Sequence, residues 1–180
     1  MTAKMVIFAG PALAGKTTLA REFARRRAYV FLSGDDVRKR LFSLPEQTEE
    51  RRDASYNAMH FAAGLVASLG HDVVIEATYI RTSRRQALAS VIRECGATPF
   101  LVECSINVET ALERLEHRGP EHPGIDLIEA RVRELVHTYS FSNLGVFIRT
   151  ESLSVEQCVD IVEREFDRRA LDLRLWTHED

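Results

Sequence analysis

Short apolar runs alternate with amphipathic stretches along most of the chain. Five of these runs are nearly continuous in apolar residues and bounded by glycine or polar residues, which is typical of buried strands: KMVIFAG, YVFLSG, DVVIEAT, TPFLVECS and GVFIRT. Between them lie segments with apolar residues three or four positions apart, as in TTLAREFARRR, which predict helices that bury one face. Buried strands alternating with helices indicate a parallel sheet covered on both faces. The pattern therefore predicts an α/β fold, a three-layer domain with a five-stranded parallel sheet.

Polar residues and glycines mark the expected ends of several helices. Thr48 and Asn107 are each placed to cap a helix with a side-chain oxygen. Ser154 followed by Gln157 has the spacing of a capping box. Gly96 follows the helix that we expect from about residue 83 to residue 95, where a left-handed residue can end it.

Composition bounds the kind of protein. With 180 residues, 45% of them hydrophobic, the chain suits a single domain over residues 1–180. The 24 Lys and Arg against 27 Asp and Glu give a net charge of -3, so no overall basic field indicates nucleic-acid or membrane binding. No apolar run approaches the roughly 18 residues that span a membrane, and no signal-peptide-like leader precedes the first strand, so we expect a cytoplasmic protein. The three cysteines are far apart among apolar residues, which is typical of core thiols.

A glycine-containing loop joins the first strand to the first helix. Gly10, Gly15, Lys16 and Thr17 satisfy the pattern G-x-x-x-x-G-K-[ST] in the strand, loop and helix context that the motif requires. Backbone N–H groups of such a loop turn inward around phosphate oxygens, and the helix adds its positive N-terminal end. Lys16 would neutralise the outer phosphates, and Thr17 would offer its hydroxyl to Mg²⁺. The loop residues expected to bind the nucleotide are Gly10, Ala12, Leu13, Ala14, Gly15, Lys16, Thr17 and Thr18.

Phosphate binding alone does not distinguish a switch, a hydrolase and a kinase. The Asn-Lys-x-Asp sequence expected of a GTPase is absent. A mechanical ATPase would usually be longer and have an acidic pair ending an apolar strand, whereas the comparable strand here ends in Glu76 followed by Ala77. The other motifs therefore have to decide what happens to the bound phosphate.

An acidic residue and an arginine follow the second strand. In SGDDVRKR, Asp35 and Arg38 lie three residues apart at a helix start, so both can project from its first turn toward the carboxyl end of the strand. Ligands of open α/β sheets bind at that edge. A carboxylate there can accept the proton of an attacking hydroxyl, and a neighbouring arginine can hold a polar group of the acceptor. The alternative is a helix-capping aspartate with a solvated arginine.

Four segments in this order and at these spacings resemble a known family: GPALAGKTTLA, GDDVRKRLF, VVIEATYIRTSRRQ and RLEHRG. It is the family of small P-loop kinases that includes polynucleotide 5'-kinases, zeta toxins and chloramphenicol phosphotransferase, and the similarity runs from about Met5 to Phe166. The resemblance implies a P-loop kinase-type fold and a phosphotransferase that uses ATP, or GTP, with Mg²⁺. Members phosphorylate hydroxyls on very different molecules, so the resemblance implies a hydroxyl-bearing acceptor without naming it.

Matched by position, the resemblance gives roles to the residues singled out above. Lys16 would be a catalytic lysine on the phosphates, Thr17 the Mg²⁺ ligand and Asp35 the general base. Arg38 matches the arginine that polynucleotide kinases direct at the acceptor. Asp35 and Arg38 are therefore expected to bind the acceptor.

The strand IEATYIRT is similar to the zeta-toxin strand whose glutamate and threonine contact a sugar-nucleotide. The resemblance thus implies that Glu76 and Thr78 bind the substrate. Polynucleotide kinases tend to have an asparagine where Tyr79 stands, so the sequence departs from their pattern here. The alternative for Glu76 is a core-edge acid satisfied by Arg81 or by a backbone donor.

A short lid is expected at about residues 114–126. Arg114 and Arg118 lie four residues apart on one helical face, just before GPEHPG, whose glycines and prolines cannot continue a helix. In the resembling kinases lid arginines stabilise charge on the transferred phosphoryl group, which implies a catalytic role for Arg118 and a nucleotide-binding role for Arg114. The alternative is an exposed helix whose arginines pair with Glu113 and Glu116.

The sequence leaves the acceptor open. The basic clusters at residues 38–40 and 84–85 can converge on the acceptor side, which suits a phosphorylated or polyanionic acceptor, but no aromatic stacking platform accompanies them. Three acceptor classes remain: a 5'-hydroxyl end of RNA or DNA, a nucleotide-sugar, and a small hydroxylated metabolite or antibiotic. SGDDVR also resembles a stretch of adenylylsulfate kinase. A non-catalytic regulatory or toxin-like module that binds nucleotide and acts through a protein partner is the rival function, and the oligomeric state is not predicted.

Overall fold

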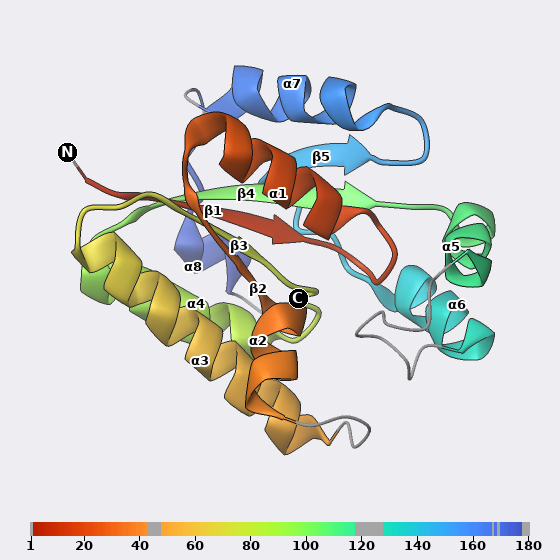
Figure 1. The fold of residues 1–180 in the computed structure, drawn as a ribbon, viewed down its shortest axis with the longest axis horizontal. Helices are drawn as coiled ribbons and strands as arrows, with labels where there is room; N and C mark the ends of the chain where they lie inside the picture. The colour runs from red at the N-terminus through yellow and green to blue at the C-terminus, as the bar shows by residue number, and fades with distance from the viewer. Residues whose placement is uncertain (1, 43–47, 118–127, 167, 169, 178–180) are drawn as a thin grey trace.

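A five-stranded parallel sheet runs through the centre of the molecule (Figure 1). This computed structural model describes residues 2–42, 48–117, 128–166, 168 and 170–177. The strands are β1 (Lys4–Ala9), β2 (Val30–Ser33), β3 (Val73–Glu76), β4 (Thr98–Ser105) and β5 (Val146–Arg149), in the order β2-β3-β1-β4-β5. All neighbouring strands pair in parallel, which confirms the predicted sheet.

Helices cover both faces of the sheet, as Figure 1 shows. On one face lie α1 (Lys16–Arg27) and α7 (Val155–Phe166), and on the other lie α3 (Glu49–Ser68), α4 (Thr82–Cys95) and α8 (Leu173–Trp176). Because side chains of a strand alternate between its faces, β1 contributes to two cores. Val6 and Phe8 pack in the cluster with α1 and α7, and Met5 and Ile7 pack in the cluster with α3 and α4. The predicted three-layer α/β arrangement is confirmed.

The predicted helix caps are present where the structure can test them. The side chain of Thr48 accepts a hydrogen bond from the backbone of α3, and that of Asn107 accepts one from the backbone of α5 (Val108–Glu116). Ser154 and Gln157 bond each other's backbone N–H groups at 3.2 and 2.9 Å, a reciprocal capping box. Gly96 ends α4 in a left-handed conformation with φ 67°.

The carboxyl ends of three strands meet at one edge of the sheet. Phe8 of β1 and Ser33 of β2 both pair with Glu76, the last residue of β3. The loop after β1, the helix α2 (Gly34–Leu41) after β2, and the segment after β3 therefore leave the sheet at the same level. Helices α5 and α6 (Glu129–Thr138) lie beyond the carboxyl ends of β1 and β4 in Figure 1. This arrangement places the described parts of the predicted site at one edge of the sheet.

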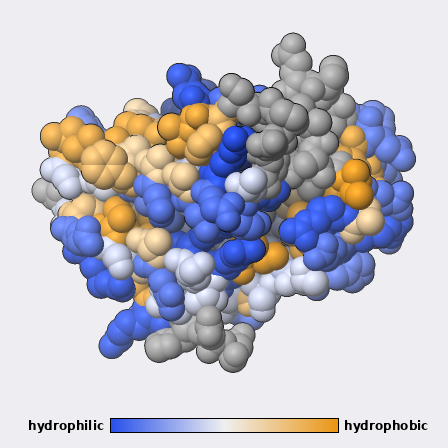
Figure 2. Space-filling model, turned by 90° about the horizontal axis from the view of Figure 1, so that it is seen from below, coloured by the Kyte–Doolittle hydropathy of each residue, from blue (hydrophilic) through white to orange (hydrophobic). Residues whose placement is uncertain are grey.

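Helix α3 is the longest of the described helices, with 20 residues, and its first turn is strongly charged, with the sequence EERRD. No helix in the described part of the chain combines the length and the apolarity needed to cross a membrane. Farther along, α3 exposes Phe61 and Leu65, and its C-cap residue Leu69 is exposed as well. The face below the sheet has a hydrophobic area toward one end and hydrophilic residues across its centre (Figure 2).

Candidate active site

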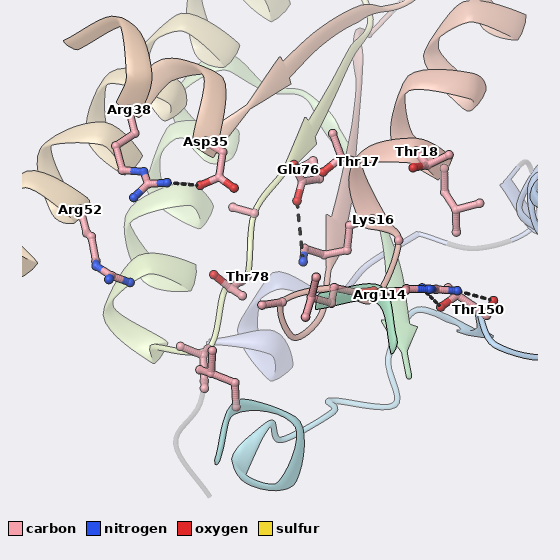
Figure 3. Close-up of a pocket in the computed structure, with 18 of the residues that line it drawn as sticks. Lys16, Thr17, Thr18, Asp35, Arg38, Arg52, Glu76, Thr78, Arg114 and Thr150 are labelled. Atoms are coloured by element: carbon pink, nitrogen blue, oxygen red, sulfur yellow. Dashed lines mark hydrogen bonds and ion pairs between the residues drawn. The ribbon is translucent and has the colours of Figure 1, made fainter. Parts of the chain in front are cut away.

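A cavity of about 610 Å³ opens at the carboxyl edge of the sheet (Figure 3). Its volume falls within the roughly 300–1,000 Å³ that small-molecule sites have. The predicted site residues that line it are Ala12, Leu13, Gly15, Lys16, Thr17, Thr18, Asp35, Arg38, Glu76, Thr78 and Arg114. Two further loop residues, Gly10 and Ala14, do not line the cavity: Ala14 is buried in the core. Arg118 lies outside the described residues, as does the predicted lid from residue 118 to residue 126.

The phosphate loop between β1 and α1 is shaped by its glycines and its lysine. Gly15 stands at the N-cap of α1 with φ 72°, and its position has no side-chain cap. A Cβ at Gly10 would collide with the carbonyl oxygen of Cys104, which accounts for the first glycine of the motif. The Nζ of Lys16 donates to the carbonyl oxygen of Pro11 at 2.8 Å, and the lysine side chain is buried. The loop is therefore a compact turn that presents the N-terminus of α1 to the cavity.

Glu76 lies beneath the phosphate loop at the end of β3. The hydroxyl of Thr17 donates to Glu76 Oε2 at 3.1 Å, and the hydroxyl of Ser33 donates to the same oxygen at 3.1 Å. The Nζ of Lys16 stands 3.8 Å from Glu76 Oε1 (Figure 3). The sequence left two interpretations of Glu76 open: a substrate-binding residue, or a core-edge acid satisfied by Arg81 or by a backbone donor. The described partners of Glu76 are Lys16, Thr17 and Ser33, so pairing with Arg81 finds no support.

Burial governs the electrostatics of Glu76. The carboxyl is 6% exposed, and loss of hydration raises its pKa above the ordinary value. The nearby charge of Lys16 opposes that rise, whereas the charge of Asp35 adds to it. A hydroxyl and a carboxylate in contact are the hard oxygen donors that Mg²⁺ prefers, and a cation beside a buried carboxylate would favour its ionised form. Thr17 and Glu76 thus fit the magnesium site that the fold implies.

Asp35 and Arg38 face the cavity from the first turns of α2. They form an ion pair between Arg38 Nη2 and Asp35 Oδ1 at 2.9 Å (Figure 3). The Asp35 side chain is 50% exposed, whereas that of Arg38 is 12% exposed. The expectation that both residues project from one turn toward the sheet edge agrees with this geometry. Asp35 is therefore an accessible carboxylate paired with a much less exposed arginine side chain.

Three further arginines gather around a single glutamate on the same side of the cavity. Glu49 at the start of α3 lies 2.9 Å from Arg84 Nη2, 3.1 Å from Arg81 Nη2 and 4.0 Å from Arg52 Nε. Arg84 also contacts Asp53 at 2.8 Å. Glu49 and the three arginines that contact it all line the cavity. Sequence reasoning missed Glu49 and Arg52, because only the fold brings the start of α3 to this edge.

An aromatic network supports the segment after β3. The hydroxyl of Tyr56 lies 3.1 Å from Thr78 Oγ1 and accepts from the backbone N–H of Tyr79 at 3.3 Å. Tyr79 is fully buried and has a left-handed backbone conformation with φ 53°. Its ring stacks on that of His60, with 5.8 Å between the ring centroids, and packs against Trp176, with 5.6 Å between the centroids. The sequence analysis did not single out Tyr56. Tyr79 is the residue at which the sequence departs from the polynucleotide-kinase pattern. In this structure its side chain packs in the core, and its packing holds the neighbouring Thr78 in place.

Arg114 connects the phosphate loop to the end of β5. Its Nη1 donates to the carbonyl oxygen of Leu13 at 2.9 Å and to Thr150 Oγ1 at 3.3 Å, and its Nη2 donates to the Thr150 carbonyl at 3.2 Å (Figure 3). These partners differ from the glutamates of the alternative in which Arg114 belongs to an exposed, ion-paired helix. The guanidinium therefore lies against the loop at the edge of the cavity.

Comparison with known proteins identifies the fold family. A family model described as an AAA domain, AAA_33, matches residues 5–141. The chain belongs to the AAA_33 family. The solved structures similar to this AAA_33 protein include a candidate kinase from Chloroflexus aurantiacus J-10-fl, with a TM-score of 0.77 and 19% identity over 91% of this chain and 98% of that one.

Two other similar structures are kinases with named acceptors. A gluconokinase from Sinorhizobium meliloti 1021 has a TM-score of 0.67 and 18% identity to the AAA_33 protein, over 98% of this chain and 99% of that one. The APS kinase CysC of Mycobacterium tuberculosis, solved with AMPPNP and APS, has a TM-score of 0.69 and 20% identity, over 92% and 98% of the two chains. At these identities the likeness is one of fold. The AAA_33 protein has a P-loop kinase-like, nucleotide-binding fold, which confirms the resemblance inferred from the sequence.

Proposed function

We propose that this protein is a phosphotransferase that moves the γ-phosphoryl group of ATP, or of GTP, to an acceptor hydroxyl. The observation that carries the proposal is the cavity that Lys16 of the phosphate loop and Asp35 of α2 line together. A switch needs only the first of these groups, whereas transfer to an acceptor hydroxyl is favoured by a carboxylate positioned beside the phosphates to take the hydroxyl proton.

The part of the cavity lined by Lys16, Thr17 and Arg114, here named the donor end, would hold the nucleotide. Backbone N–H groups at the start of α1 would surround the phosphates, and Lys16 would neutralise the outer ones. Thr17 and Glu76 would hold Mg²⁺, whose charge neutralises the phosphate oxygens when it is bound. The contact between Thr17 and Glu76 supports a donor-side role for Glu76 in place of the substrate contact that the resemblance implied.

The part lined by Asp35, Arg38 and Thr78, with the arginines around Glu49, is here named the acceptor end. Asp35 would orient the acceptor hydroxyl and take its proton. The hydroxyl oxygen then forms a bond to the γ-phosphorus, and the bond from that phosphorus to the bridging oxygen breaks, which releases ADP or GDP. Arg38 would hold the Asp35 carboxylate in the orientation that meets the acceptor hydroxyl. Arg118 is the proposed lid arginine, and such a group can contribute about 10³ to 10⁵ in rate.

The decisive experiment follows the γ-phosphate. Protein is incubated with γ-labelled ATP or GTP, Mg²⁺ and a panel of 5'-hydroxyl oligonucleotides, nucleotide-sugars and small hydroxylated metabolites or antibiotics. We expect the label to move to one of these classes with acceptor-dependent release of ADP or GDP. A polynucleotide 5'-kinase would label only the oligonucleotides. A non-catalytic module would bind the nucleotide and release no ADP or GDP with any acceptor.

The base assignment has a matched control in the next residue. Asp35→Asn should lower transfer by about 10² to 10⁴, as expected for loss of a general base, and should leave nucleotide binding unchanged. Asp36→Asn should leave both unchanged, because Asp36 pairs with Arg21 at 2.8 Å and does not line the cavity. Full transfer activity of the Asp35→Asn protein would overturn the assignment.

A further inference from the structure

We propose that two copies of this protein form a dimer through α3, with the second half of the helix packed antiparallel against the same helix of the other copy. The proposal concerns a surface outside the cavity, and it does not depend on the proposed phosphotransferase function. It rests on the apolar face of α3 and its C-cap from residue 54 to residue 69, here named the α3 face.

The α3 face has no charged residue. The chain has no Asp, Glu, Lys or Arg between Asp53 and Asp72, although such residues make up 28% of the sequence. A helix at a protein surface normally presents charged and polar residues to water. Helix α3 and its C-cap instead present Phe61, which is 72% exposed, Leu65, which is 53% exposed, and Leu69, which is 69% exposed. Figure 2 shows hydrophobic residues gathered toward one end of the molecular face below the sheet, where α3 lies. Contiguous exposed apolar residues of this kind mark interaction sites.

Large and small side chains form two rows on the α3 face. Each row repeats every four residues, and residues at this spacing form one ridge along a helix. The large row and the small row are, in turn, Phe61, Leu65 and Leu69, and Ala54, Ala58 and Ala62. None of the three alanines is buried, so the small row is a shallow groove beside the ridge of large side chains.

The two rows complement each other when a second α3 runs antiparallel to the first. A two-fold axis brings the same surface of both copies together, so each contact occurs twice with the copies exchanged. With the axis between residues 61 and 62, every large side chain faces an alanine of the other copy. The pairs are Phe61 with Ala62, Leu65 with Ala58, and Leu69 with Ala54. Because helices pack by placing ridges into grooves, the order of residues on this face favours a second copy as its partner.

Other occupants fit the α3 face less well. Helices that bind membrane surfaces are rich in Lys and Arg on their polar side, and the chain has neither from residue 54 to residue 71. A different protein would not require an alanine row that matches the large row in register. The cavity also stays accessible in the dimer, because none of the six paired residues is among the described residues that line it.

The size of the α3 face predicts a weak dimer. At about 1.5 Å per residue the face is roughly 22 Å long, and it is one helix, about 10 Å, wide. A standard interface buries about 800 Å² on each partner, which is more than one helix face of this size provides. We therefore expect a dimer with a dissociation constant on the order of 10⁻⁵ M, in exchange with the monomer.

The first test is sedimentation velocity of the full chain over concentrations on both sides of the expected dissociation constant. We expect the mass to rise from the 20.4 kDa of the monomer toward twice that value and no further, because a two-fold interface closes on itself. Sulfate should strengthen the dimer, since it favours apolar burial, whereas ion pairs would weaken as salt rises. A monomer at every concentration overturns the inference, as does growth into species larger than a dimer or weakening by sulfate.

The second test removes one side chain of the large row. Leu65→Gln should weaken the dimer at least about tenfold, because the apolar side chain is lost from both copies. Leu175→Gln is the matched control: it removes a leucine of similar exposure from α8 and should dimerise like the parent protein. Urea unfolding at a concentration where the parent is monomeric checks that both variants fold. Equal dimerisation of folded Leu65→Gln and the parent overturns the inference.

The third test exchanges the large and the small member of one pair. Ala58→Leu makes the face more apolar, yet it should weaken the dimer about tenfold, because it fills the position that Leu65 of the other copy occupies. The double variant Ala58→Leu with Leu65→Ala restores one large and one small side chain in each pair and should recover the dimer. No recovery in the double variant overturns the inference. Stronger association of Ala58→Leu alone also overturns it, and would identify a general apolar surface open to a lipid or to another protein.

Discussion

The donor and acceptor ends of the cavity are built in different ways. The donor end is built mainly from one contiguous segment, residues 10–17, whose Lys16 lies beside the buried carboxylate of Glu76, and Arg114 of α5 lies against this loop. The acceptor end is assembled from α2, α3, the segment after β3 and the start of α4. Its lining carboxylates Asp35 and Glu49 are about half exposed, and both form ion pairs with arginines.

This difference has a functional consequence. A loop whose backbone forms the binding surface suits a ligand that stays the same, such as a nucleoside triphosphate. Side chains from several helices can be exchanged one by one without disturbing the sheet. The acceptor end is therefore the part of the cavity where single substitutions can change the binding surface with the least effect on the sheet.

The largest effect is expected at the donor end. Lys16→Ala should abolish turnover, with a loss of at least about 10² to 10³, because a preorganised charge on the phosphates is removed. Acceptor-dependent ADP release measures the loss, and Lys39→Ala on the exposed side of α2 is the control. Retained turnover in a folded Lys16→Ala protein would contradict the donor assignment and remove the contrast between the two ends.

The next effect concerns magnesium. Glu76→Gln keeps the hydrogen-bonding shape but removes the charge beside Thr17, so the Mg²⁺ affinity of the AMP-PNP complex should fall about 10- to 100-fold. Titration of Mg²⁺ against nucleotide binding measures it. Unchanged Mg²⁺ affinity together with a raised acceptor KM would move Glu76 to the acceptor end, where the resemblance to zeta toxins implied that it belongs.

Two buried groups, His60 near the acceptor end and Glu76 at the donor end, should change the free energy of unfolding in opposite directions as the pH rises. Burial lowers the pKa of His60, which supports the acceptor end, from 6.5 to about 4. The unfolded chain then binds more protons between these values, so acidification from pH 6.5 to pH 4 should remove about 3 kcal/mol of the free energy of unfolding. Burial raises the pKa of Glu76 above 4.5, so the stability that its protonated form contributes is lost as the pH rises through the raised pKa.

Urea unfolding across the pH range separates the two groups. His60→Gln should flatten the acid side of the profile, and Glu76→Gln should reduce the loss of stability on the side above pH 4.5. Parallel profiles of the parent and His60→Gln proteins would show that the histidine is not held neutral by burial.

The smallest effect should come from one hydroxyl of the aromatic network. Tyr56→Phe removes the group that joins Thr78 to the backbone of Tyr79, so acceptor KM should rise by a factor of about 5, equivalent to roughly 1 kcal/mol for one hydrogen bond. Tyr139→Phe is the matched control, because its buried hydroxyl has no hydrogen-bond partner among the described residues. Equal acceptor KM values for the two variants would limit the network to a packing role.

Local patterns predicted the framework and the strand-loop-helix arrangement around Lys16. The strands, the caps at Thr48 and Asn107 and the loop around Lys16 each depend on neighbouring residues, so a single segment of sequence contains the information. The partners of Glu76 could not be predicted in this way. Its contacts with Thr17 and Ser33 join residues 59 and 43 positions apart, through the alignment of β1, β2 and β3.

By itself the sequence determined the α/β class, the parallel sheet and the phosphate-binding loop, because hydrophobic periodicity and backbone chemistry act over a few residues. Only the tertiary structure decided that Glu49 and Arg52 line one cavity with Asp35, that Tyr56 contacts Thr78, and that Glu76 lies beside the phosphate loop. These contacts depend on the order of the strands and on the packing of α3 against α4, and no local pattern in the chain specifies either.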